Sequence, residues 1–210
     1  MTPFKDQILA RLERYFGEVP QVVPVSGELE LAVVPGQSAD GATYNAVFTL
    51  GLSAHAMEGV PDPDWRYAEL VLLLPRDWPL QPSSSNWPLI WLERLVMFPR
   101  RQNSWLGLAH TIPNGIPAQP FDETTQFAAW MLIPPVELAK EFARFRLDSG
   151  EVINFWTPIP IYADELALKT NKGATELINK FARAGIGDIF DPNRVSIYQR
   201  KTNIFGKYKN

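Results

Sequence analysis

The sequence contains no cysteine among its 210 residues and only two histidines, His55 and His110. Disulfide bonds, thiolate metal ligands and cysteine nucleophiles are therefore excluded. A zinc site would have to take most of its ligands from carboxylates, and neither a His-x-x-x-His nor a His-Glu-x-x-His spacing is present. We therefore expect no metal site. The lack of cysteine also agrees with a reducing compartment.

A strong excess of one charge is also missing. The 20 basic and 23 acidic residues give a net charge of −3. Nucleic acid is an unexpected partner, because binding through phosphates requires a basic excess. No apolar run approaches the roughly 20 residues that a membrane-spanning helix needs. The first residues lack the basic and apolar regions of a signal peptide. These absences predict a cytoplasmic protein with no membrane association.

Motifs for nucleotide binding and hydrolysis are absent as well. The sequence has no glycine-rich phosphate loop and no G-x-S-x-G elbow. Paired carboxylates can act as acid and base. Each of the four acidic pairs, however, lies near a proline, a glycine or a helix start, where carboxylates serve turns and caps. We therefore expect no catalytic residue and no cofactor. The pairs are Asp62 with Asp64, Asp122 with Glu123, Asp164 with Glu165, and Asp188 with Asp191.

The sequence does contain enough apolar material for a large core, with 46% hydrophobic residues and seven tryptophans. Apolar residues at helical spacing predict helices over 4–16, 87–99, 163–170 and 174–184. Apolar runs between turn residues predict strands over 29–34, 43–50, 67–74, 107–111 and 125–133. The turn Asp148-Ser149-Gly150 predicts a hairpin of strands over 142–147 and 151–161.

These elements mix without a regular βαβ alternation, and no linker or internal repeat divides the chain. The order favours an α+β fold with a mixed, mostly antiparallel sheet flanked by helices. We predict a single domain over residues 1–195. The polar residues 196–210 are predicted to form a final strand or a loose tail.

The most unusual segment, residues 100–115, combines arginines, asparagines, a tryptophan and a histidine with glycines and a proline. One interpretation is a functional surface, because arginine and tryptophan are favoured interface anchors. The other is a polar network that fixes a loop, with His110 hydrogen-bonded and Trp105 in the core. Composition favours the network, because buried polar groups normally find partners. The candidate interaction residues are Arg100, Arg101, Asn103, Trp105, His110, Thr111 and Asn114.

Several motifs resemble the Suppressor of fused (Sufu) family. The most specific are Asn103-Ser104-Trp105-Leu106-Gly107 and His110-Thr111-Ile112-Pro113-Asn114-Gly115, with Ser104 in place of the family's threonine and Ala109 in place of its glycine. Segments 67–78, 87–92, 158–162 and 191–194 also match, in the family's order. The resemblance implies a single Sufu-like domain. In its length the chain resembles a bacterial stand-alone member that lacks the animal protein's additional domain.

The resemblance implies a binding protein that has neither catalysis nor a cofactor. The animal regulator holds a transcription factor by strand addition of a short extended peptide. Bacterial members are proposed immunity proteins, which neutralise a toxin domain made by a neighbouring gene. We therefore predict a protein-binding module, with an immunity role as the narrower prediction. Two alternatives stay open: a hydrolase that uses His110 and nearby polar residues in a deep pocket, and a scaffold or regulatory subunit that works as a homo-oligomer.

Overall fold

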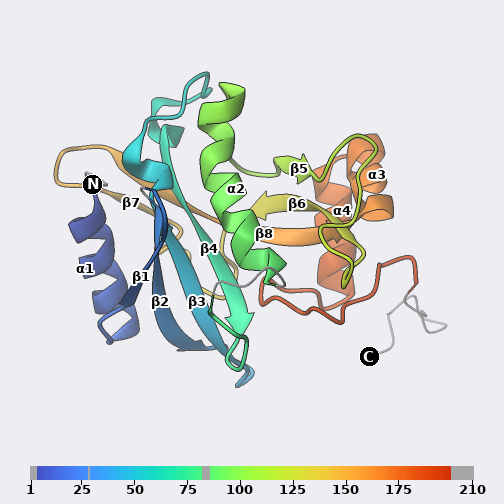
Figure 1. Ribbon diagram of the computed structural model, residues 1–210, viewed down its shortest axis with the longest axis horizontal. Helices are drawn as coiled ribbons and strands as arrows, with labels where there is room; N and C mark the ends of the chain where they lie inside the picture. The colour runs from blue at the N-terminus through green and yellow to red at the C-terminus, as the bar shows by residue number, and fades with distance from the viewer. Residues whose placement is uncertain (1–3, 28, 82–85, 200–210) are drawn as a thin grey trace.

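The computed structural model describes residues 4–27, 29–81 and 86–199 (Figure 1). Its helices are α1 (Lys5–Phe16), α2 (Trp87–Gln102), α3 (Ala163–Lys172) and α4 (Ala174–Arg183), with short 3-10 helices η1 (Leu52–Ala54) and η2 (Pro63–Trp65). Its strands are β1 (Gln21–Ser26), β2 (Leu29–Gln37), β3 (Thr43–Leu50), β4 (Tyr67–Pro75), β5 (Thr111–Pro113), β6 (Phe127–Ile133), β7 (Arg144–Arg146) and β8 (Val152–Tyr162).

All eight strands join one sheet in the order β1-β2-β3-β4-β8-β6-β5, and β7 pairs with the first part of β8. Among the described strands, the pairing of β4 with β8 is parallel and the other strand pairings are antiparallel. The predicted α+β fold with a mixed, mostly antiparallel sheet is confirmed. The predicted hairpin is also present, as β7 and β8.

Strands β4 and β8 are paired only over their first residues and separate beyond them. Their pairing ends at Leu70 and Trp156. The N–H group of Phe155 donates to Ala143 on the β7 side of β8, so even-numbered residues of β8 direct their N–H groups towards β4. Positions 158 and 160 are prolines and have no N–H group to offer. The last part of β4 therefore has a different hydrogen-bond partner on this edge. The carbonyl of Leu73 accepts a hydrogen bond from the N–H group of Phe190 at 2.7 Å.

Alternating apolar residues give the sheet two buried faces. On β4, Leu70 and Leu72 face α2, while Val71 and Leu73 face α1. The helix pair α3–α4 packs on β6 and the end of β8, on the same face of the sheet as α1. Figure 1 shows α2 running diagonally across β4 and β8, to one side of β1–β3. In the described part of the chain, α2 thus covers one face, and α1, α3 and α4 cover the other.

Several predicted boundaries are wrong for identifiable reasons. The strand predicted over 107–111 begins only at Thr111, because residues 107–110 form a turn that a 3.1 Å bond from the N–H group of His110 to Gly107 closes. Helix α2 continues past Pro99 to Gln102. Strand β1 was not predicted. Residues 200–210, most of the predicted terminal strand or tail, lie outside the described part of the chain. No helix in the described part is long and apolar enough to span a membrane.

Candidate functional site

The predicted contact between Trp105 and His110 is present in the loop between α2 and β5. The two ring centroids lie 4.0 Å apart, and Nδ1 of His110 lies 3.1 Å from the carbonyl oxygen of Trp105. A carbonyl only accepts, so Nδ1 carries the proton. Burial lowers the pKa of His110 below its usual value, and the hydrogen bond to Trp105 partly offsets this effect. A neutral imidazole therefore fixes this loop.

The backbone of the same loop explains two of its residues. Gly107 is required, because a Cβ atom there would lie 2.3 Å from Cζ3 of Trp105. Ala109 has a φ of 61°, a left-handed conformation that glycine adopts more readily. Trp105 also lies 5.4 Å from Trp65, measured between ring centroids. The loop is thus fixed by aromatic packing on one side and by a tight backbone turn on the other.

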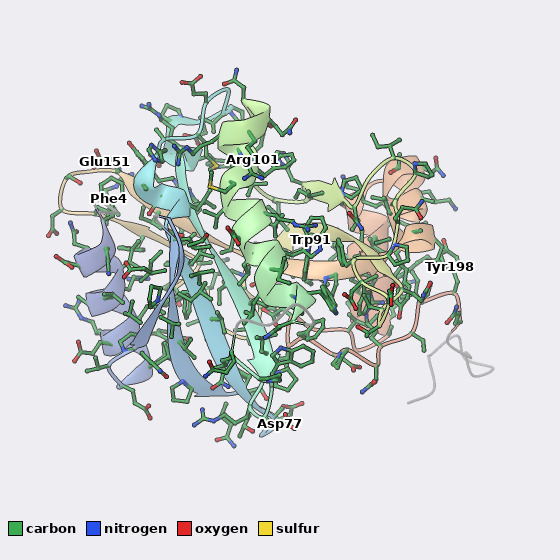
Figure 2. The ribbon with its side chains drawn as sticks, viewed as in Figure 1. Phe4, Asp77, Trp91, Arg101, Glu151 and Tyr198 are labelled. Carbon is green, nitrogen blue, oxygen red and sulfur yellow. The ribbon has the colours of Figure 1, made fainter. Side chains whose placement is uncertain are left out.

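The remaining candidate residues separate into two groups. Arg100, Arg101 and Asn103 are exposed at the carboxyl end of α2, where Figure 2 labels Arg101. Thr111 and Asn114 lie at β5. The hydroxyl of Thr111 accepts from Nζ of Lys169 at 3.4 Å, and Nδ2 of Asn114 donates to Pro120 at 2.6 Å. The seven predicted residues therefore form no single cluster.

A pocket of about 290 Å³ lies beside this segment and bears on the hydrolase alternative. His55, Arg100, Asn103 and Ser104 are among its lining residues, and His110 is not one of them. The deep pocket that a His110-dependent hydrolase requires is therefore not this one. Among the residues that the structure describes, no three histidine, aspartate or glutamate side chains gather as a metal site.

A groove of about 490 Å³ lies between β1 and α2, and we call it the α2 groove. Val23 and Val25 of β1 form one wall, and Leu89 and Ile90 of α2 form the other. Its floor is apolar and comes from Leu31, Val33 and Val47 of β2 and β3. Sequence reasoning missed the groove because it missed β1, in which Pro24 interrupts the strand pattern.

A second cavity of about 290 Å³ continues this groove towards the carboxyl end of α2, and the name α2 groove covers both cavities from here on. Met97, Arg100 and Arg101 line it from the helix side. Glu93 lines both cavities and accepts a 2.6 Å hydrogen bond from the hydroxyl of Ser26 across the groove. The groove is thus apolar at one end, acidic at Glu93 and basic at the other end.

Three of the eight carboxylates in the predicted acidic pairs serve turns, as predicted. Asp62, Asp122 and Asp191 each accept the N–H group two residues ahead, at Asp64, Thr124 and Asn193. Asp188 is buried and accepts the N–H groups of Val136 and Glu137. Burial raises the pKa of Asp188, and these two bonds oppose the shift.

Glu165 has a further role that its sequence neighbourhood does not indicate. Its carboxylate is fully buried and receives both terminal nitrogens of Arg194, at 2.6 and 2.8 Å. The guanidinium also donates to the carbonyl of Pro160 at 2.7 Å. Three aromatic rings surround it within 5.2 Å. This buried pair joins the segment after α4 to α3 and β8.

A second buried carboxylate, Glu69, was also missed. It lies on β4 and is fully buried, and five donors reach it from Thr49, Gly51, Leu52 and Ser53. Burial raises its pKa, and the hydrogen bonds oppose that shift. No basic side chain bonds to Glu69 in the described residues, so the carboxylate orders the backbone of η1 by hydrogen bonds alone.

Comparison with known proteins agrees with this fold. The family model of the Suppressor of fused protein (SUFU) matches residues 27–195. The crystal structure of the Sufu-Fu complex superposes with a TM-score of 0.72 at 14% identity, over 94% of this chain and 93% of that one. Drosophila Suppressor of Fused gives 0.71 at 13% identity, and the match covers 94% of this chain and 52% of that one. No curated protein sequence matches. The chain belongs to the Suppressor of fused family.

Proposed function

We propose that this chain is a protein-binding domain. The observation that carries the proposal is the α2 groove, a large cavity whose floor is a buried sheet face and which is apolar at one end and basic at the other, with Glu93 between the two ends. Apolar surface rimmed by polar groups is typical of protein interaction sites. One similar structure is itself a complex, that of Sufu with Fu.

Strand addition at the outer edges of the sheet is a poor mode of binding for this chain. Edge strand β1 contains Pro24, and its pairing with β2 shifts register between Pro24 and Ser26. Edge strand β5 has three residues and ends in Pro113. Proline offers no N–H group to an added strand, and irregular or short edges discourage such pairing. Recognition by side chains in a groove fits these edges better.

The narrower proposal is an immunity role, in which the partner is a toxin domain from a neighbouring gene. It rests on the family resemblance alone. The test is co-expression of this chain with the neighbouring gene product, followed by co-purification and a growth assay. A 1:1 complex that restores growth supports immunity. A 1:1 complex with a harmless partner refutes immunity and keeps the protein-binding proposal.

The scaffold and hydrolase alternatives are tested on the purified chain. Light scattering measures its mass in solution, and a defined oligomer that forms without a partner favours the scaffold. Turnover of a small substrate that His110→Asn abolishes without loss of stability favours the hydrolase. Failure to recover any partner, together with such turnover, would overturn the protein-binding proposal.

A further inference from the structure

The two sides of the α2 groove run together for most of the length of α2. Along β1 the lining passes from Gln21 through Val25 to the turn at Gly27. Along α2 it passes from Ile90 to Arg101, which spans about 16 Å of helix. The hydrogen bond from Ser26 to Glu93 joins the two sides midway. The lining is therefore long and narrow, and its chemistry changes from one end to the other.

At the apolar end of the groove, two apolar side chains are not fully packed against the rest of the domain. Val23 and Ile90 line the cavity and are partly exposed, and neither belongs to the packed cores of the domain. The floor beneath them is already buried, with Val47 fully inaccessible. Large apolar side chains inserted from outside would cover Val23 and Ile90 without displacing the core. A volume of about 490 Å³ is large enough for more than one such side chain.

The basic end of the groove favours a bound segment that carries a negative charge. Arg101 is exposed beside the second cavity, and its neighbour Arg100 lines the same cavity. Basic side chains at the carboxyl end of a helix suit its dipole, and an exposed arginine there also offers a positive charge to an anionic group from outside. The occupant that fits both ends carries apolar side chains at one end and a carboxylate at the other.

From these features we propose that the α2 groove binds a short amphipathic segment of a partner protein, with large apolar side chains beside Val23 and Ile90 and an acidic side chain beside Arg101. This inference rests on the proposed function and specifies its surface. A segment fits better than a small apolar molecule, because the apolar and basic ends are separated by about 16 Å along α2. Side-chain recognition also avoids the proline-interrupted edge of β1.

The test uses a phage library of random peptides about 15 residues long, selected against the full chain. Selected peptides are expected to share large apolar residues followed or preceded by an acidic residue. Ile90→Asp should weaken their binding by about tenfold or more. Arg101→Glu should weaken it less and should be rescued by an acidic-to-lysine change in the peptide. Ile178→Asp, at an exposed apolar position on α4, is the matched control and should leave binding unchanged.

Urea unfolding and circular dichroism of each variant confirm that the fold is intact before binding is measured. Selected peptides whose affinity does not respond to Ile90→Asp or Arg101→Glu would overturn the proposal, and so would a library that yields no binder. Stoichiometric binding of palmitate in the groove, without peptide binding, would assign the cavity to a small ligand instead. A partner protein that still binds the groove variants would refute this surface and leave the protein-binding function standing.

Discussion

Replacing Arg194 with methionine tests the buried ion pair with Glu165. Methionine keeps most of the apolar stem, but it removes the two bonds to the carboxylate and the bond to Pro160. Side-chain exposure is 4% for Arg194 and 0% for Glu165, so water cannot replace the guanidinium. Removing one partner of such a pair costs about 3–5 kcal/mol. We expect Arg194→Met to lower the free energy of unfolding by that amount.

Urea unfolding followed by tryptophan fluorescence measures this loss, with the slope of the transition compared between variants. Arg183→Met, at an exposed position on α4, is the control and should change stability by less than about 0.5 kcal/mol. The double variant Arg194→Met/Glu165→Met should lose less than the sum of the two single losses, because no uncompensated charge stays buried. It should not regain full stability, because Glu165 also accepts the N–H groups of Tyr162 and Ile197. A loss below about 1 kcal/mol for Arg194→Met, or strictly additive losses, would refute the reasoning.

Three further predictions concern other buried or strained groups. Ala109→Gly should raise stability by about 0.5–1 kcal/mol, because glycine relieves the left-handed φ of 61°; a lower melting temperature would contradict this. Glu69→Gln should cost about 1–3 kcal/mol in urea unfolding, because an amide nitrogen would face N–H donors that now meet an oxygen; exposed Glu123→Gln is its control and should change little. Because the pKa of His110 is lowered in the fold, the unfolded chain binds more protons near its ordinary pKa of about 6.5, and stability falls as pH drops through that value. His110→Asn should remove part of that fall, and an unchanged pH profile of unfolding would count against a neutral imidazole in the folded chain.

The sequence predicts the regular parts of the fold well because their periodicity is local. The stripe along α1 and the apolar run of β4 each identify an element without any tertiary knowledge. Strand β1 was not predicted, because its side chains are only partly buried and Pro24 interrupts the strand pattern. The turn over residues 107–110 was not predicted either, because alanine rarely adopts the left-handed φ of 61° that Ala109 has there.

The candidate site is less predictable because its residues come from distant segments. The motif around Trp105 and His110 was identified from the sequence, and its internal contact is present. The α2 groove depends on β1, β2 and α2 meeting in space, and no local pattern encodes that meeting. Glu165 and Arg194 are likewise 29 residues apart, so their pairing could not be read from either neighbourhood.

The strand order also has a consequence for the order in which the newly made chain can fold. Strands β1 to β4 form a local meander that can pair as soon as they leave the ribosome. The exposed edge of β4 must then wait for β8, whose paired residues 153–156 are synthesised more than 75 residues later. The core beneath α1 is likewise incomplete until Phe142 and Phe155 have been synthesised. Nascent chains that stop before residue 156 therefore present an apolar strand with one unpaired edge, and we expect chaperones to bind them until synthesis passes that point.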